Sequence, residues 1–268
     1  MSDLVPSYVL KIDRAVEHLK EFKRIYAEYV KSEPYTVVSG REGKKEFHRL
    51  QFSSQIEPRA KMIAADFIYN VRSGLDHFAA ALNPRKMRGS VMFPIFSEGV
   101  WGEVQTGENK EQTKARERWK TSTREMQPGA VAILKEIQPP ESARDDAGNL
   151  HLLVILNRLS NKDRHTELPL MPVGLAEFGA MWQLPGSDQW YGGFERRTWG
   201  MVNDNAEIGV PDGALNVKVT GTPKLAIRAS GPDWEVEVPA YFDNLINYVR
   251  NYVFTPLFPF LFVSPAKK

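Results

Sequence analysis

The stretch 58–82 constrains the fold most, because nothing inside it would end a helix. It begins with Pro58, has no interior proline, and is followed by Asn83-Pro84, an order typical of a helix with a defined start and stop. At about 100° per residue its large apolar side chains fall on one stripe. They are Phe67, Val71, Leu75, Phe78 and Leu82. The stretch therefore predicts a long central helix with one face in a core.

A cluster of polar residues interrupts the other faces of this helix. Arg72 and Asp76 are four residues apart and nearly opposite the apolar stripe, which predicts an exposed ion pair. Arg72 and His77 are separated by about 140° around a straight helix. A polar seam runs about 80° to one side of the apolar stripe. Its members are Asp66, Asn70, Ser73 and His77.

A second polar cluster, 157–165, ends another apolar helical stretch, 149–163. Leu152, Leu156 and Leu159 set the core side of that helix, and Asp163 is the next residue on the same side. A lone buried carboxylate is costly. Asp163 therefore either lies in water at the helix end or pairs with a donor from another helix, for which His77 and Arg72 are candidates. We expect a contact between His77 and Asp163.

The remaining patterns predict an α+β fold. Two further amphipathic helices are expected at 6–31 and 241–253, so that with 58–82 and 149–163 the bundle has about four long helices. The charged stretch 108–124 is typical of a solvated helix. An N-terminal β-hairpin is expected at 35–52, and alternating apolar residues predict a β-rich insertion before the last helix. The expected division is a helical bundle with the hairpin over 1–165, a β-rich block packed on the bundle over 166–239, and a helix and apolar tail rejoining the bundle over 240–268.

The apolar tail 253–263 is too short to cross a bilayer, and Pro256 and Pro259 interrupt the helix that a span would need. We expect no membrane span. The tail is expected to pack on the bundle. The alternative is a subunit interface, in which the bundle or this aromatic tail forms a homodimer.

Composition excludes several classes of function. The chain has 35 basic and 33 acidic residues, so it has no strong general attraction to nucleic acids. It has no cysteine, which excludes disulfides and thiolate sites and suits a cytoplasmic location. The sequence also lacks phosphate-binding, dinucleotide-binding and nucleophile-elbow motifs. Nucleotide kinases, dinucleotide enzymes and α/β-hydrolases are therefore disfavoured.

The helical arginine and histidine carry a resemblance to a known family. Arg72, four intervening residues and His77 match the arginine-x4-6-histidine motif of the HEPN superfamily. The stretches 69–77 and 156–165 together also resemble a set of uncharacterised bacterial proteins. The resemblance implies a small helical bundle in a bacterial cell that binds nucleotides or cuts RNA without a metal or other cofactor, often as a dimer.

In such a ribonuclease the attack of a ribose 2′-hydroxyl needs a base, and the charge that grows on the phosphate needs a cation. The resemblance implies His77 as general base or acid and Arg72 as the cation. Asp76 or Asp163 would orient the imidazole. The supporting residues would be Asn70, Ser73, Asn161, Arg164 and His165.

Two other interpretations of the clusters stay open. In the first, the protein is a non-catalytic structural or interaction protein, in which the Arg, Asp and His side chains form a polar lock between helices. In the second, carboxylates and histidines hold a metal between helices. The candidate ligands would be Asp66, His77, His151, Asp163 and His165. Aromatic residues of the β-rich block, Trp190 and Tyr191 among them, are expected to pack in a sheet or to stack on bases or sugars.

Overall fold

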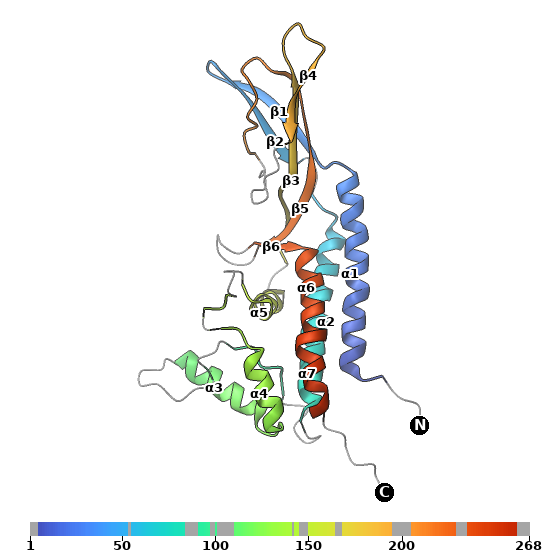
Figure 1. The fold of residues 1–268 in the computed structure, drawn as a ribbon, viewed down its shortest axis with the longest axis vertical. Helices are drawn as coiled ribbons and strands as arrows, with labels where there is room; N and C mark the ends of the chain where they lie inside the picture. Colours follow the sequence, from blue (N-terminus) through green and yellow to red (C-terminus); the bar gives the residue numbers. More distant parts are fainter. Residues whose placement is uncertain are drawn as a thin grey trace. The chain divides into compact units, whose positions relative to one another are not determined.

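A computed structural model of the chain describes residues 5–52, 55–83, 91–96, 100, 110–140, 142–144, 150–163, 168–194, 205–228 and 235–261. The chain forms two compact units. The helical unit contains Met1–Lys20, Ile63–Glu167 and Ala240–Lys268, and the strand unit contains Glu21–Met62 and Leu168–Pro239. Figure 1 shows the elements of both units. No helix in the described part of the chain combines the length and the apolar character that crossing a membrane requires.

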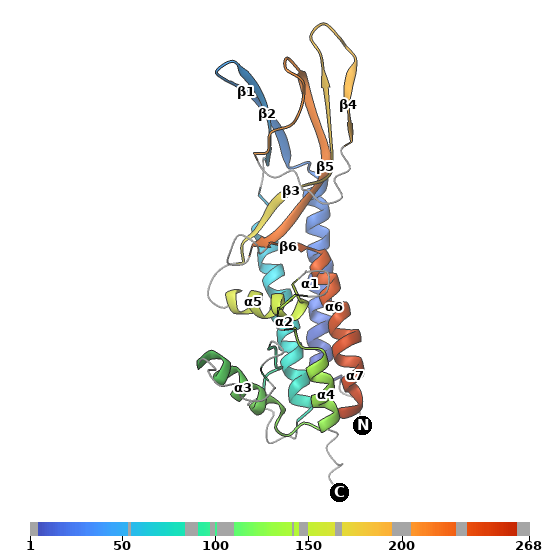
Figure 2. The ribbon, with the colours of Figure 1, turned by 60° about the vertical axis from the view of Figure 1, so that its left-hand side comes forward.

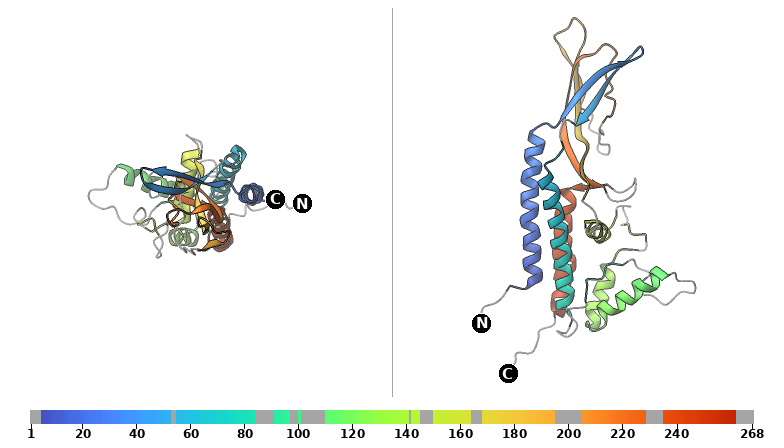
Figure 3. Two further views of the ribbon diagram at one scale, coloured as in Figure 1. Left: turned by 90° about the horizontal axis from the view of Figure 1, so that it is seen from above. Right: turned by 180° about the vertical axis from the view of Figure 1, so that it is seen from behind.

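Three helices run alongside one another in the helical unit (Figures 1 and 3). They are α1 (Ser7–Lys31), α2 (Pro58–Ala81) and α6 (Ala240–Tyr248), of which the helical unit includes α1 up to Lys20 and α2 from Ile63. Aromatic rings join them: Phe67 of α2 stacks on Phe242 of α6 with ring centroids 4.0 Å apart, and Tyr8 of α1 meets Phe78 edge-on. All five residues of the predicted apolar stripe of α2 are fully buried. The central helix and its core face are thus confirmed.

Gly74 allows α1 and α2 to approach closely. A β-carbon at this position would lie 2.9 Å from the Cδ1 atom of Ile12, which is tighter than ordinary van der Waals contact. A glycine inside a helix normally lowers its stability. Here the missing side chain is what lets Ile12 pack against α2.

Shorter helices complete this unit. The α5 helix (Leu152–Asp163) is seen end-on in Figure 1, where α2 and α6 run lengthwise, so it crosses them. The prediction of about four long helices is only partly correct, because two of the four are short: α5 has 12 residues and α6 has nine. The charged helix is present as α3 (Lys110–Thr123), which is followed by α4 (Pro128–Glu136). A helix can be this short here because packing rather than local propensity stabilises it.

The described part of the C-terminal tail packs on the bundle, as expected. A π-helical segment, Val249–Phe254, continues α6 and leads into α7 (Thr255–Leu257) and a 3-10 turn, Phe258–Phe260. Val253, Phe254 and Leu257 are buried. The Phe254 ring stacks on Phe78 with centroids 4.2 Å apart. The dimer interface stays a prediction.

The strand unit confirms the hairpin and the β-rich block. The hairpin consists of β1 (Tyr35–Glu42) and β2 (Lys45–Phe52). A separate antiparallel sheet has the strand order β4-β3-β5-β6, as Figure 2 shows. Its strands are β3 (Leu170–Gln183), β4 (Trp190–Phe194), β5 (Leu215–Arg228) and β6 (Glu235–Val238).

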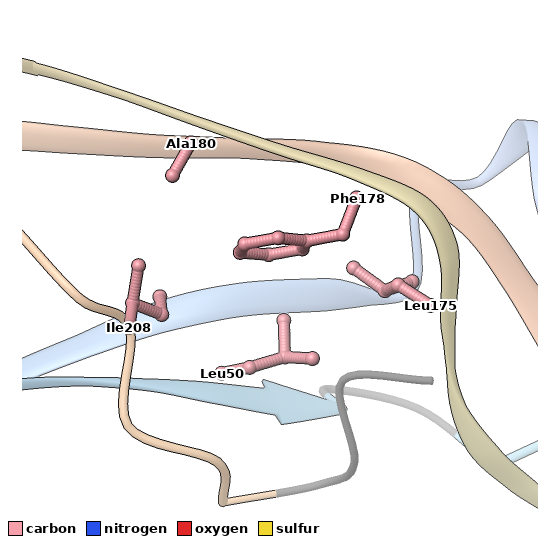
Figure 4. Packing of buried hydrophobic residues seen from close by; sticks show 5 residues of the cluster. All are labelled: Leu50, Leu175, Phe178, Ala180 and Ile208. Atoms are coloured by element: carbon pink, nitrogen blue, oxygen red, sulfur yellow. The ribbon is translucent and has the colours of Figure 1, made fainter. Parts of the chain in front are cut away.

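The hairpin shares a core with this sheet. Leu50 of β2 packs with Leu175 and Phe178 of β3 and with Ile208, and these side chains point toward one another in Figure 4. The backbone N–H of Leu50 also donates to the carbonyl of Ala206 at 3.0 Å. The hairpin was expected within the segment 1–165, but it belongs to the strand unit, because its apolar face finds its partners about 120 residues later in the chain.

Candidate functional site

Arg72 is buried, contrary to the prediction of an exposed ion pair. Only 7% of its surface is accessible. Its Nη2 atom lies 3.1 Å from Oδ1 of Asp76, one turn further along α2. The same Nη2 donates a hydrogen bond of 3.0 Å to the carbonyl of Phe93. The predicted ion pair is therefore confirmed, but the prediction that it is exposed is wrong.

A distant segment causes this burial. The 91–96 segment brings Phe93, 1% exposed, against the core, and the backbone N–H of Phe93 donates to Oδ1 of Asp76 at 2.9 Å. Val91 and Ile95 of the same segment are buried as well. A helical wheel places residues relative to their own helix, so it carries no information about a loop that covers the opposite side.

Arg72 lines a cavity of about 720 Å³, which we call the Arg72 cavity. The 91–96 segment, α3 and α5 form its other walls. Three cationic side chains face it, from Arg72, Lys114 and Arg118, whereas Glu117 is the one carboxylate among the described lining residues. The lining residues are Arg72, Met92, Phe93, Pro94, Ile95, Phe96, Lys114, Glu117, Arg118, Thr121, Ser122, Asn157 and Asn161.

The α3 helix contributes one charged face to the Arg72 cavity. Lys114, Arg118 and Thr121 follow one another at four and three residues, so they lie on the same side of the helix. Lys114 and Arg118 are exposed. On another side of α3, Trp119 is buried and its ring meets that of Phe96 edge-on at 6.5 Å. This aromatic contact anchors α3 to the 91–96 segment.

The second polar cluster supplies the amides of the cavity. Asn157 and Asn161 lie four residues apart on α5 and both line the Arg72 cavity. Leu156 and Leu159 of the same helix are fully buried, as expected, whereas the neighbouring Leu153 is buried in place of Leu152. The buried leucines fix the helix, and the amides follow on its cavity side.

His77 faces a different cavity. Its Nδ1 atom lies 2.9 Å from the hydroxyl of Ser7 at the start of α1. This second cavity, of about 500 Å³, is the His77 cavity. Its lining residues are Pro6, Ser7, Tyr8, His77, Ala80, Ala81 and Leu261. The structure therefore does not bring Arg72 and His77 together, in keeping with their angular separation on α2.

The other expected site residues are dispersed. Asn70 is buried and its Nδ2 donates to the carbonyl of Asp66 at 2.8 Å, within α2. Ser73 is half-buried. The side chain of Asp163 and the residues Arg164 and His165 lie outside the described part of the chain. The contact between His77 and Asp163 stays a prediction.

His151, named as a metal ligand, takes part in a hydrogen-bonded network instead. Its Nδ1 accepts from the backbone N–H of Leu153 at 3.3 Å, and its Nε2 lies 3.3 Å from the hydroxyl of Tyr248. That hydroxyl donates to the carbonyl of Ile137 at 3.0 Å, so His151 Nε2 is the donor to Tyr248. Burial raises the pKa of Tyr248 to about 12. In the described part of the chain no three His, Asp or Glu side chains converge to hold a metal.

Sequence reasoning missed Lys114, Arg118 and Asn157 as site residues. The four-residue spacing of the two cations on a helix was visible, but it matches any solvated helical face. Nothing in the sequence shows that this face lies opposite Arg72.

In the strand unit, two of the aromatic residues singled out from the sequence are partly exposed. Trp190 is 39% exposed, and the Nζ atom of Lys218 lies 4.4 Å from its ring centroid. Tyr191 is 37% exposed. Both aromatic residues belong to β4, an edge strand of the sheet.

Comparisons with known proteins found no relative of this chain. No family model matches it, and no characterised protein and no solved structure is significantly similar to it.

Proposed function

We propose that this protein is a nucleotide-binding module and that the Arg72 cavity is its ligand site. The observation that carries the proposal is that both polar clusters reach the same cavity. Arg72 comes from the first cluster, and Asn157 and Asn161 come from the second. Two clusters about 85 residues apart in the chain thus contribute to one concave surface.

The size and lining of the cavity support a ligand of this kind. Its volume of about 720 Å³ lies within the range of roughly 300 to 1,000 Å³ typical of small-molecule sites. Cationic side chains suit phosphate groups. Asparagine amides offer both donors and acceptors to the edge of a base. Met92 and Phe96 add partly exposed apolar surface for the face of a base.

Binding is better supported than RNA cleavage. A metal-independent ribonuclease needs its base and its cation at the same phosphodiester. None of the described residues that line the Arg72 cavity is a histidine, and His77 lines the other cavity. Arg72 and His77 are therefore not positioned to act on one phosphate group, and we propose no cleavage.

The test measures by calorimetry whether AMP, GMP, CMP or UMP binds to the full chain at equilibrium. We expect at least one of them to bind with a Kd in the micromolar range, and Asn157→Ala with Asn161→Ala to weaken that binding. Absence of binding by all four would refute the proposal. In parallel, a mixed RNA pool in EDTA tests the nuclease directly. Cleavage that a folded His77→Ala variant loses would establish a ribonuclease instead.

One observation favours the second candidate, a non-catalytic interaction protein with a polar lock. Arg72 and Asp76 bind both the carbonyl and the N–H of Phe93, which fixes the 91–96 segment without any ligand. Under this alternative, variants of the cavity residues Asn157 and Asn161 change neither stability nor binding of any nucleotide.

A further inference from the structure

We infer that a nucleotide lies in the Arg72 cavity with its phosphate against Lys114 and Arg118 of α3 and its base between the α5 amides and the 91–96 segment. This inference rests on the proposed function and assigns the roles of its residues. It makes α3 the phosphate-binding element, although the HEPN-like motif points to Arg72.

Arg72 is held by contacts within the protein itself. Its guanidinium is buried, and its Nη2 atom contacts both the carboxylate of Asp76 and the carbonyl of Phe93. The neighbouring carboxylate compensates most of the positive charge on this wall. A phosphate that took over Nη2 would leave the Phe93 carbonyl buried without this partner, which costs free energy. Arg72 is thus a positioning residue that holds the 91–96 segment.

The α3 helix carries the exposed positive charge of the cavity. Lys114 and Arg118 are exposed, and lie about one turn apart on the cavity side of the helix. Between them they carry two positive charges against one negative charge of Glu117. Exposed cations keep a phosphate in contact with water, so the phosphate avoids the full cost of desolvation. The most favourable place for an anionic group is therefore this side of the cavity.

The remaining walls of the cavity carry amide and apolar side chains. Asn157 and Asn161 project from α5, and the 91–96 segment presents Met92 and the half-buried Phe96. Neutral amides and apolar side chains bind a base without charge, through its edge and its face respectively. The two kinds of wall thus match the two halves of a nucleotide.

The experiment compares a nucleotide with its nucleoside. The probe is the tightest binder among AMP, GMP, CMP and UMP, and its affinity is measured by calorimetry beside that of the corresponding nucleoside. The variant is Lys114→Ala with Arg118→Ala. The control is Lys120→Ala, a cation of the same helix that lies outside the cavity lining. Circular dichroism confirms that each variant is folded.

We expect the wild type to bind the nucleotide at least 10-fold more tightly than the nucleoside. The double α3 variant should lose this difference, while the affinity for the nucleoside and the behaviour of Lys120→Ala stay unchanged. Substitution of Asn157 and Asn161 by Ala should weaken nucleotide and nucleoside by the same factor.

Two failures are distinguishable. If a nucleotide binds and the double α3 variant binds it as tightly as the wild type, the orientation is wrong and the proposed function stands. If no nucleotide binds the wild type, the proposed function itself fails. A folded double α3 variant that weakened the nucleoside as much as the nucleotide would also overturn the assignment of the phosphate to α3.

Discussion

Arg72 and Asp76 together bind both backbone polar groups of one residue, Phe93. The guanidinium of Arg72 donates a hydrogen bond to the carbonyl of Phe93, whereas the carboxylate of Asp76 accepts one from its N–H. The two side chains also form an ion pair of 3.1 Å with each other. A pair at positions four residues apart on a helix therefore acts as a clip that holds a distant segment, and the Phe93 side chain becomes part of the core.

These contacts predict that Asp76→Ala lowers the stability of the protein strongly. The substitution removes the carboxylate from a buried guanidinium and removes the acceptor of the Phe93 N–H. We expect the free energy of unfolding to fall by about 2 to 4 kcal/mol, somewhat less than for a fully buried pair, because 23% of the Asp76 side chain is exposed. Urea denaturation of the wild type and the variant measures this difference.

The matched experiment is the double variant Arg72→Met with Asp76→Ala. Because the guanidinium is then absent, the cost should be clearly smaller than the sum of the two single substitutions. Additive costs would show that the two side chains do not stabilise each other.

Gly192 and Gly193, which are neighbours in β4, allow a test of how β4 packs against β3. Gly192 has a φ of 139°, and a β-carbon there would lie 2.2 Å from the carbonyl oxygen of Ala180. Gly192→Ala should therefore separate β4 from β3 and destabilise the strand unit by about 2 kcal/mol or more. Gly193 has no atom within 4 Å of such a β-carbon, so Gly193→Ala should change stability by less than about 0.5 kcal/mol. Hydrogen exchange of the β3 and β4 amides is the measurement, and equal effects of both substitutions would contradict the strand register.

Tyr248 predicts a loss of stability at alkaline pH. Burial raises its pKa from 10.0 to about 12, so the unfolded chain loses this proton at lower pH than the folded protein. The contribution to stability is complete below pH 10 and declines as the pH approaches 12, by about 3 kcal/mol in total.

The effect of Tyr248→Phe on stability should change sign between pH 8 and pH 12. At pH 8 the variant lacks the hydrogen bond to the Ile137 carbonyl and should be about 1 kcal/mol less stable than the wild type. Near pH 12 it should be the more stable of the two, because phenylalanine has no proton to lose. Urea midpoints of both proteins at several pH values measure this; a constant difference between them would show that Tyr248 is not buried as described.

The ring stack between α2 and α6 gives a further prediction. Phe242 is fully buried against Phe67, so Phe242→Ala should lower the free energy of unfolding by about 3 to 5 kcal/mol. Phe258 is 43% exposed, and Phe258→Ala should cost clearly less. Thermal unfolding of the two variants compares them; equal losses would contradict the position of α6 against α2.

Where the sequence predicted correctly, the signal lay within one element. Proline spacing and the apolar stripe of Phe67, Val71 and Leu75 determined α2 and its core face, because a helix repeats its geometry every 3.6 residues. The alternation of apolar residues likewise predicted the strands of the β-rich block. The lengths of α5 and α6 were less certain, since helix ends depend on packing.

The tertiary structure alone decided what lies next to these elements. Periodicity placed Arg72 away from the core of its own helix, but the 91–96 segment covers that side, so Arg72 is buried and Asp76 half-buried. In the same way, Lys114 and Arg118 became candidate ligand-binding residues only because the structure places α3 and Arg72 at the same cavity. Local sequence encodes the direction in which a side chain leaves its helix or strand. Which distant segment meets it depends on how all the apolar faces of the chain are buried together, and no local pattern contains that information.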